Sequence, residues 1–370
     1  MVMPSKIKRF FECYVPVTAC NFRCEYCYII QASRNKGEMP KFAYSPEHIG
    51  KALTTERLGG ICYFSICGGG ETLLPKEVVT IIYELLKNGH YVNVTTNGTH
   101  TKAFDRICEV IPKEMLKRLH FAFSLHYNEL MRLDLLGVFS SNVKKMRDAG
   151  CSILVQMNLY DGYLSHLEEI KNYCIDNFGA MPQVAATRLG ADSCRLHTRH
   201  AECEYKSRGE EFQSPLFDFT MRNFNVSRKG NFCYAGEWSA LINLATGVMN
   251  PCYSCGRSQN IFEDISRPID FRPVGYDCRL FFCVNSSHFL SLGVMPSLYQ
   301  EITYAGLRNR KAANWYSSEM EAFLGGKLNE NNKEFSPIQL QYKRVLWWGL
   351  RLKRFLKSIA RKMYDFIRKN

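Results

Sequence analysis

The sequence lacks any long apolar run. Its most apolar stretches, residues 61–67 and 345–350, are far shorter than the roughly 20 residues that a membrane-spanning helix needs. Residues 1–12 carry three basic side chains but no apolar run followed by a small-residue cleavage site, so we expect no secretory signal. These two absences predict a cytoplasmic protein without a membrane span.

The composition also excludes disorder and collagen-like structure. The 370 residues are 46% apolar, 22% charged and 13% aromatic, which is typical of a protein that folds around a core. The length predicts two or three domains, the largest of which can bury a full-sized core.

Cysteine, in contrast, is abundant, with 16 residues. A cytoplasmic compartment keeps thiols reduced, so metal ligation is the leading explanation for any clustered set, ahead of disulfides. Scattered cysteines within apolar runs are expected to be buried and to act as small hydrophobic residues. These are Cys13, Cys62, Cys108, Cys151 and Cys174.

The first half of the chain alternates β-favouring apolar runs with longer amphipathic stretches, which predicts parallel strands joined by helices. The predicted strands are 10–18, 61–66, 91–96, 120–125, 153–159 and 183–188, and the predicted helices are 46–58, 75–88, 102–116, 142–149 and 164–177. Six such units predict an α/β fold, a partial (β/α)6 barrel similar to a TIM barrel, whose chemistry lies at the carboxyl ends of the strands.

Three domains are expected along the chain. The partial barrel occupies residues 1–214, a second unit 215–300 and a helical basic tail 301–370. Within the first of these, residues 190–214 are polar and lose periodicity, which indicates a linker or a loop that faces the substrate. The second unit has short strand-like runs, frequent Gly and Pro, and five cysteines.

Three cysteines follow the first predicted strand directly. Cys20, Cys24 and Cys27 have C-x3-C-x2-C spacing. Three thiolates leave one iron of a cubane iron–sulfur cluster with open positions for a ligand that is not protein. Zinc loops usually supply four ligands in C-x2-C pairs, so the spacing favours the cluster, although a zinc site stays open as an alternative.

The loop around these cysteines resembles the signature loop of the radical S-adenosylmethionine (SAM) superfamily. Residues 18–28 read TACNFRCEYCY, with Tyr26 in the aromatic position before the third cysteine. Three further motifs follow successive predicted strands in the same order as in that family. They are GGGETLL at 68–74, TTNGT at 95–99 and SLH at 124–126. The resemblance covers roughly residues 10–300 and implies a [4Fe-4S] cluster, bound SAM and a reductant such as flavodoxin or ferredoxin.

The resemblance also implies which residues bind SAM. They are Tyr26, Gly69, Gly70, Glu71, Thr96, Asn97, Ser124 and Asn158. Glycine lets a backbone approach a ligand closely. Glu71 would accept hydrogen bonds from the methionine ammonium, while the Tyr26 backbone would serve the adenine and its ring would pack. Each short polar residue taken alone is also a common turn former or cap, and His126 fits either a ligand contact or a structural role.

A second cysteine set lies in the 215–300 unit. Cys233 and Cys252 have C-x13-G-x4-C spacing around Gly247, and residues 238–244 with the turn at 245–247 predict a β-hairpin that brings the two cysteines together. The spacing is similar to the opening of SPASM and twitch auxiliary-cluster domains. That resemblance implies one auxiliary [4Fe-4S] cluster with Cys278 and Cys283 as the other ligands, and Cys255 as spare or alternative. A structural zinc in the same thiolates is the competing interpretation.

The tail is strongly basic. Residues 338–370 hold ten Lys or Arg and one acid, Asp365, so they supply +9 of the net charge of +13. Apolar residues recur from Val345 at steps of three or four, which predicts an amphipathic helix with a cationic face. This helix fits a peripheral membrane contact anchored by Trp347 and Trp348, or a terminal helix docked on the barrel. Nucleic-acid binding is disfavoured, because no recognised RNA or DNA motif accompanies the charge.

By resemblance, the chain is expected to be an oxidoreductase or modifying enzyme. It would cleave SAM reductively to a 5′-deoxyadenosyl radical and abstract hydrogen from a peptide, a protein or a sugar-type metabolite. Arginine offers a bidentate fork to anionic groups, so candidate substrate residues are Arg188, Arg195, His197 and Arg199. The alternative is a non-catalytic iron–sulfur or zinc scaffold protein recruited to a membrane surface.

Overall fold

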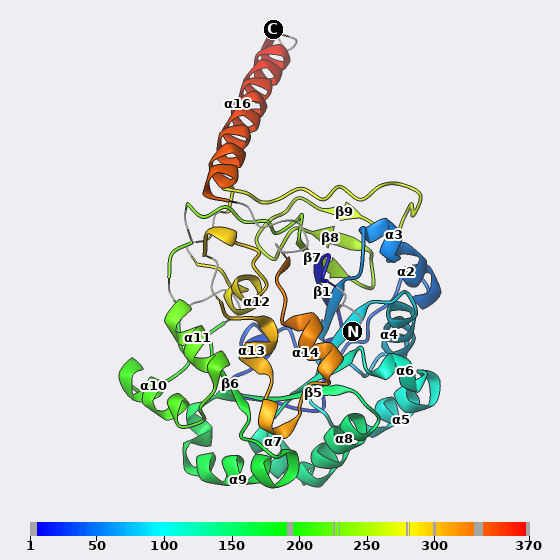
Figure 1. Cartoon of the computed structure of the whole chain (residues 1–370), viewed down its shortest axis with the longest axis vertical. Coiled ribbons are helices and arrows are strands. Elements are labelled where there is room, and N and C mark those ends of the chain that lie inside the picture. Colours follow the sequence, from blue (N-terminus) through cyan, green and yellow to red (C-terminus); the bar gives the residue numbers. More distant parts are fainter. Residues whose placement is uncertain are drawn as a thin grey trace. The chain divides into compact units, whose positions relative to one another are not determined.

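Figure 1 shows the computed structural model of the chain. It describes residues 6–190, 195–224, 226–228, 230–278, 280, 282–298, 301–328 and 336–367. The described residues up to 328 form one compact unit, and residues 336–367 belong to a second. The predicted boundaries at residues 214 and 300 both fall inside the first unit and stay predictions, and the outer limits at 1 and 370 lie outside the described residues.

A single sheet organises the first unit. Its order is β6-β5-β4-β3-β2-β1-β7-β8-β9. The strands are β1 Phe10–Val15, β2 Tyr63–Gly68, β3 Tyr91–Thr96, β4 Leu119–Ser124, β5 Ser152–Leu159, β6 Gln183–Ala186, β7 Ser239–Asn243, β8 Val248–Asn250 and β9 Gln259–Asn260. The first six are parallel and follow the sequence order, which confirms the predicted α/β fold with a parallel sheet.

The second cysteine region continues this sheet. Strand β7 pairs in parallel with β1, on the side of β1 opposite β2, and places Leu241 beside Glu12. Strand β8 then returns antiparallel to β7. The predicted hairpin is confirmed, and Gly247 has φ +75° in its turn, a backbone conformation that glycine adopts without strain.

Helices surround the parallel strands (Figure 1). Those between β1 and β6 are α1 Tyr28–Gln31, α2 Pro46–Ala52, α3 Thr55–Leu58, α4 Glu77–Lys87, α5 Thr101–Val110, α6 Lys113–Leu116, α7 Tyr127–Arg132, α8 Leu136–Asp148, η1 Asp161–His166 and α9 Leu167–Phe178. After β6 come α10 Glu202–Glu210, α11 Pro215–Asn223, α12 Ser286–Ser291, η2 Pro296–Leu298, α13 Tyr304–Arg308, η3 Lys311–Ala313 and α14 Ser318–Leu324. Helix α4 buries Val78, Ile81 and Leu85, so it supplies one layer of the core.

Two predicted helices are each divided in the structure. The stretch 46–58 breaks at Leu53, because the Thr54 hydroxyl accepts a hydrogen bond from the Arg57 amide at 3.3 Å and starts α3. The stretch 102–116 breaks at Pro112, which has no amide hydrogen to continue α5. A sequence window that averages over these positions merges the two halves.

Two further expectations are wrong. Residues 190–214 are not wholly a linker or loop, because α10 forms there and is stabilised by exposed pairs at i, i+4 spacing, such as Arg208 with Glu204 at 2.7 Å. Cys108 is exposed rather than buried, because it lies on the outward face of α5. The other four cysteines predicted to be core are buried.

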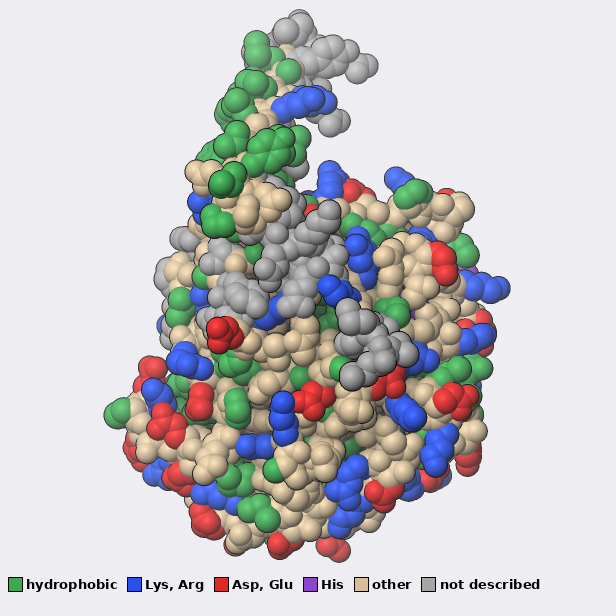
Figure 2. Space-filling model, in the orientation of Figure 1, with side chains coloured by type: hydrophobic (Ala, Val, Ile, Leu, Met, Phe, Trp, Pro, Cys, Tyr) green, Lys and Arg blue, Asp and Glu red, His purple; other side chains and the backbone are tan. Residues whose placement is uncertain are grey.

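The second unit is the helix α16, Pro337–Ile367, which begins earlier than the sequence predicts. Most of its described apolar side chains are between 37% and 82% exposed, among them Tyr342, Val345, Trp348, Leu352, Phe355, Leu356, Ile359 and Met363. Trp347 is the exception, because only 7% of its surface is exposed. Figure 2 shows hydrophobic side chains along this helix. The side chains of Phe366 and Ile367 lie outside those described. Among the described residues, no helix is long and apolar enough to cross a bilayer.

Candidate functional site

The three cysteines of the first set lie on the loop that follows β1. The amides of Thr18 and Ala19 donate to the Glu38 carbonyl at 2.9 and 3.2 Å, which fixes the start of the loop. Burial raises the pKa of the Cys24 thiol, and the neighbouring Cys27 and Cys20 thiols raise it further. The three thiols therefore lie close enough to interact electrostatically. Ligation by iron would favour their thiolate form against this burial.

The GGGE loop after β2 packs directly on the cysteine loop. A Cβ at Gly70 would lie 2.1 Å from the Ala19 carbonyl oxygen, and one at Gly69 would lie 2.9 Å from the Tyr14 hydroxyl. The Glu71 amide donates to the same Ala19 carbonyl at 2.9 Å. Only glycine at position 70 lets the two loops approach this closely.

Glu71 ties this loop to the loop after β3. Its side chain is 3% exposed and accepts hydrogen bonds from the Thr96 hydroxyl at 2.7 Å, the Asn97 amide at 2.8 Å and the Leu73 amide at 3.0 Å. Burial raises the pKa of Glu71, while these donors favour its ionised form. The structure thus gives Glu71 protein partners, and its predicted contact with the SAM ammonium stays a prediction.

Asn97 reaches back to the cysteine loop. Its side-chain amide donates to the Asn21 side-chain oxygen at 2.7 Å and lies 4.0 Å from the Cys20 sulfur. Its own side-chain oxygen accepts from the Thr99 amide at 3.1 Å. The loops after β1, β2 and β3, which the sequence predicts to meet, are therefore joined by hydrogen bonds.

Tyr26 forms a buried hydrogen-bond network through its side-chain hydroxyl. Its hydroxyl lies 2.6 Å from His126 Nδ1 and 2.9 Å from the Tyr163 hydroxyl, and its side chain also bonds to Asn158. Burial lowers the pKa of His126 to about 4, so this ring is neutral at pH 7. The ring packs on His126, Tyr160 and Tyr163 as expected, and the hydroxyl adds hydrogen bonds that the sequence did not predict, because a buried hydroxyl needs partners. Ser124, partly exposed, ends β4 beside this network.

Sequence reasoning missed Tyr163, because no motif marks it. It lies in η1, far from the cysteine triplet along the chain, and enters the network only through the fold. A second missed residue is Glu12, an acid placed inside the apolar first strand, which is a signal that the sequence does contain.

The structure gathers the second cysteine set as well. Burial raises the pKa of Cys233, and the thiols of Cys283, Cys252 and Cys278 raise it further, so these four interact electrostatically. Backbone hydrogen bonds between Cys233 and Gly275, at 3.1 and 2.8 Å, hold the segment together. Cys255 forms a β-bridge with Cys252.

Thiol donors suit both an iron–sulfur cluster and zinc. Among the described residues, no three His, Cys, Asp or Glu side chains come close enough to hold a single metal ion.

The four candidate substrate residues occupy different surroundings. The Arg188 guanidinium donates to the Val284 carbonyl at 3.1 Å, and His197 lies 3.5 Å from the Gln31 amide nitrogen, beside the cysteine loop. Arg195 and Arg199 are exposed. Arg188 and His197 are thus the two that are partly buried.

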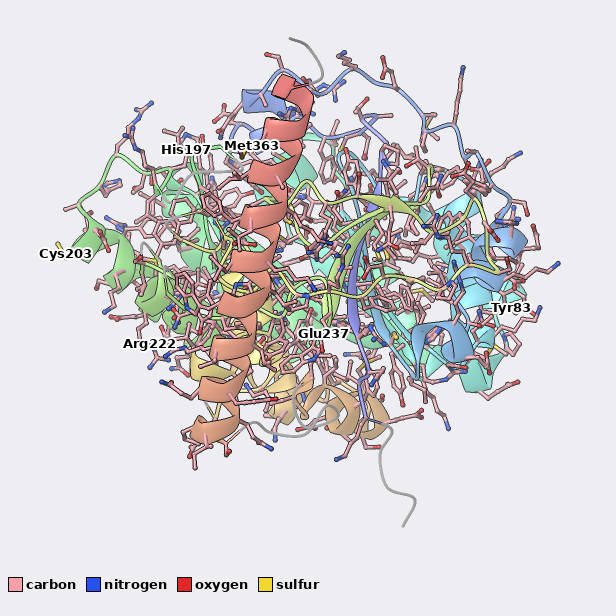
Figure 3. All side chains as sticks on the ribbon, turned by 90° about the horizontal axis from the view of Figure 1, so that it is seen from above. Tyr83, His197, Cys203, Arg222, Glu237 and Met363 are labelled. Atoms are coloured by element: carbon pink, nitrogen blue, oxygen red, sulfur yellow. The ribbon has the colours of Figure 1, made fainter. Side chains whose placement is uncertain are left out.

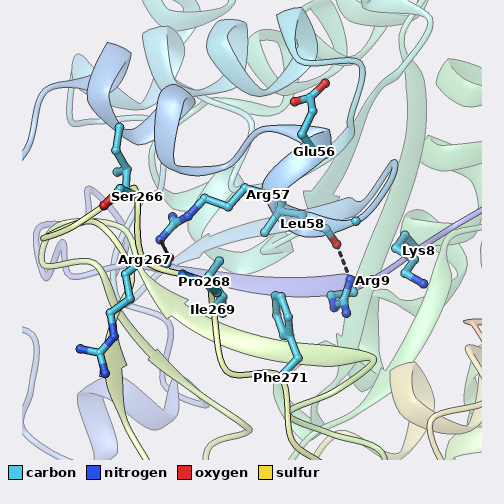
Figure 4. Close-up of a pocket in the computed structure, with 12 residues that line it drawn as sticks. Lys8, Arg9, Glu56, Arg57, Leu58, Ser266, Arg267, Pro268, Ile269 and Phe271 are labelled. Carbon is cyan, nitrogen blue, oxygen red and sulfur yellow. Dashed lines mark hydrogen bonds between the residues drawn. The ribbon is translucent and has the colours of Figure 1, made fainter.

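A pocket of about 560 Å³ lies at the other end of β1, away from the cysteines (Figure 4). Arg9 and Arg57 line it, and their guanidinium groups donate to backbone carbonyls such as those of Leu58 and Ile261. Arg9 also stacks on Phe271 at 3.8 Å. These arginines connect the 261–272 segment to the residues around β1 and α3, which is a structural role.

Comparisons with known proteins agree with the motifs. Residues 14–174, somewhat less than half of the chain, match the family model of the Radical SAM superfamily. A probable GTP 3′,8-cyclase of Pyrobaculum aerophilum is 33% identical over 85 residues, 23% of this chain and 26% of that relative. The chain therefore matches only about a quarter of the length of this curated relative.

Solved structures are also similar. Streptococcus suis SuiB bound to its precursor peptide SuiA has a TM-score of 0.47 and 15% identity, over 72% of this chain and 65% of SuiB. The enzyme anSMEcpe with bound AdoMet has a TM-score of 0.47 and 14% identity, over 93% of this chain and all of that one.

Proposed function

We propose that this chain is a radical SAM enzyme that abstracts hydrogen from a peptide, protein or sugar-type substrate. The observation that carries the proposal is the convergence of Cys20, Cys24 and Cys27 with the GGGE and TNG loops at the carboxyl ends of parallel strands. When bound there, a [4Fe-4S] cluster supplies one electron to SAM, whose cleavage gives methionine and a 5′-deoxyadenosyl radical. A flavodoxin or ferredoxin is the proposed electron donor.

The residues of the chain position these groups. Cys20, Cys24 and Cys27 would hold the cluster as thiolates, and a fourth protein ligand would not be needed where SAM binds. Gly69 and Gly70 let the GGGE loop pack closely on β1 and the cysteine loop, and Glu71 ties it to the loop after β3, so that their backbones would be held in place for SAM. Ser124 and Asn158 offer side chains at the ends of β4 and β5. Thr96 and Asn97 act mainly through Glu71 and the cysteine loop.

Anaerobic reconstitution tests the proposal. We expect the reduced protein to release 5′-deoxyadenosine from SAM. Each of the variants Cys20→Ser, Cys24→Ser and Cys27→Ser should abolish this release and should bind about four fewer irons than the wild type. Cys108→Ser, on the exposed face of α5, is the matched control and should change neither quantity. A protein that releases no 5′-deoxyadenosine despite a full iron content would instead be the non-catalytic scaffold.

The auxiliary cluster is a separate proposal. Cys233, Cys252, Cys278 and Cys283 are the proposed ligands, supported by their mutual electrostatic interaction. Replacing any one by serine should remove about four irons and leave the signal of the first cluster intact. Cys255→Ser should have no effect. Zinc in place of iron in the purified protein would contradict this assignment and support the structural zinc.

Substrate recognition is proposed to involve Arg188 and His197, which are partly buried, whereas Arg195 and Arg199 are exposed. Arg188→Ala should weaken binding of an anionic substrate group, and Arg199→Ala, at an exposed position, is the comparison. If neither change alters the KM for a substrate once it is identified, this role is wrong.

The exposed apolar stripe of α16 favours a second proposal, a peripheral contact with anionic membranes. The sequence spacing predicts lysines and arginines on the helix face away from this stripe, which suits an interfacial helix on anionic lipid. Co-sedimentation with phosphatidylserine-containing vesicles should exceed that with pure phosphatidylcholine, and Leu352→Glu should reduce it. Val110→Glu, on the exposed face of α5, is the control. Equal binding by both variants would exclude the contact.

A further inference from the structure

Helix α7 and the residue before it contact the middle of the cysteine loop. His126 and Glu129 are three positions apart, a spacing that places two side chains on the same side of a helical turn. The His126 ring packs edge-on against Phe22 at 5.7 Å and tilted against Tyr26 at 5.9 Å, measured between ring centroids. These two aromatic residues lie two positions before and two positions after Cys24, so His126 contacts the chain on both sides of this cysteine.

The Glu129 carboxylate binds the backbone of the same loop. The Arg23 amide donates to Glu129 Oε2 at 2.6 Å, and Arg23 directly precedes Cys24. Glu129 is 9% exposed, so this bond is largely shielded from water. A hydrogen bond from an amide to a carboxylate is shorter and stronger than one to a neutral oxygen. The backbone next to Cys24 is therefore held by a charged side chain of another element.

Arg132, at the end of α7, fixes the orientation of this carboxylate. Its Nε donates to Glu129 Oε1 at 2.9 Å and its Nη2 donates to Glu129 Oε2 at 2.8 Å, which is the bidentate geometry of an arginine–carboxylate pair. The guanidinium and the carboxylate neutralise each other, so the pair adds no net charge next to Cys24. The Arg132 side chain is 53% exposed, so its replacement should leave the core intact.

The loop has little else to fix its backbone near Cys24. Residues 20–26 contain no helix or strand. The Arg23 guanidinium donates to the carbonyls of Cys20 and Phe22 at 2.9 and 3.1 Å, and these bonds stay within the loop. Among the described residues, Glu129 is the only side chain outside the loop that bonds to the backbone of residues 21–25. A buried amide needs an acceptor, and Glu129 supplies it here.

We propose that Glu129, oriented by Arg132, is a positioning residue that fixes the backbone at Arg23 and so presents the Cys24 thiol to the iron–sulfur cluster. The pair also keeps the chain beside that thiol free of net charge. That the thiol binds a cluster rests on the proposed function. The shape of the loop does not, because the hydrogen bonds that hold it belong to the protein, and it is measurable without iron or SAM.

Hydrogen exchange of the iron-free protein tests the position of the loop. Exchange is followed by mass spectrometry with fragmentation that resolves single amides. We expect Glu129→Ala to speed exchange of the Arg23 amide about tenfold, because a hydrogen bond to a charged group is lost. Glu129→Gln keeps an acceptor oxygen and should speed it only about threefold. Glu169→Ala is the matched control and should have no effect, because Glu169 also bonds to α7, through the Tyr127 hydroxyl at 3.2 Å.

Iron release tests the consequence for the cluster. An iron chelator is added to the reconstituted protein, and the Cys24→Ser variant identifies the iron that belongs to the first cluster. We expect this iron to leave Glu129→Ala about tenfold faster than the wild type, because the loop no longer holds the Cys24 backbone in place. Glu129→Gln should restore most of the retention, and Glu169→Ala should match the wild type.

The midpoint potential of the first cluster separates the charge of the pair from its packing. Glu129→Gln leaves the Arg132 guanidinium without its counter-charge and should raise the potential. Arg132→Gln leaves the Glu129 carboxylate uncompensated and should lower it. A role in packing alone would not give shifts of opposite sign. Arg222→Gln, at an exposed position on α11 (Figure 3), is the control and should leave the potential unchanged.

Two results would overturn the proposal. One is exchange of the Arg23 amide that is equal in Glu129→Ala and the wild type, and the other is a potential that shifts in the same direction, or not at all, in Glu129→Gln and Arg132→Gln. If Glu129→Ala fails to fold, Arg132→Gln decides, because loss of this half-exposed ion pair should still speed exchange at Arg23 about threefold. Failure of SAM cleavage would leave the exchange results unchanged, so the two proposals can fail separately.

Discussion

Replacing Glu12 by glutamine should stabilise the fold at pH 8 and have little effect at pH 5. Burial raises the pKa of Glu12 from its usual 4.5 to about 7, while Tyr253 and Asn285 oppose that shift only in part. At pH values between these two pKa values, the Glu12 carboxyl is ionised in the unfolded chain and protonated in the folded protein. Stability is therefore lost as the pH rises through this window, by at most about 3 kcal/mol for a shift of this size.

Glutamine keeps the shape and the hydrogen-bond acceptor but never ionises. Urea unfolding at pH 5 and pH 8, followed by the fluorescence of the buried Trp238 and Trp315, measures the difference between the variant and the wild type. Contributions from other titrating groups cancel in that difference. Glu109→Gln, at an exposed position, should shift stability by less than about 0.5 kcal/mol at either pH. A difference for Glu12→Gln that is the same at both pH values would refute the reasoning.

Two glycine substitutions give further predictions. Gly70→Ala forces the Ala19 carbonyl away, so the variant should lose about four bound irons while its circular dichroism spectrum stays unchanged. Gly137→Ala is the control and should retain all of its iron, because no atom lies within 4 Å of the added Cβ. Gly247→Ala should destabilise the unit by about 1–2 kcal/mol in urea unfolding, because its φ is +75° and its Cβ would meet Asn260. Full iron in the first variant or unchanged stability in the last would count against the respective argument.

The sequence predicts the six parallel strands well, because each is an apolar run bounded by turn residues. Strand β3 agrees at both ends, and the others within a few residues. Because these strands are parallel and lie in sequence order, the sequence also predicts that the loops around Cys20, Glu71 and Asn97 lie next to one another. Carboxyl ends of adjacent parallel strands meet at one edge whatever the side chains between them.

Contacts between distant segments are what the sequence does not reveal. Tyr163 joins Tyr26 across 137 positions, and Asn285 joins Glu12 across 273. Helix α10 has no apolar stripe, so periodicity gives no signal for it and its charged pairs become evident only in the structure.

The parallel pairing of β7 with β1 has a consequence for protein engineering. Excision of residues 215–300 would strip β7 of its backbone partner and leave an unpaired edge, so this segment is not a portable module. A transplant to another host would have to bring β1 with it, and with β1 the loop that carries the first three thiols. The two sulfur-rich regions are therefore expected to be inherited, expressed and lost together.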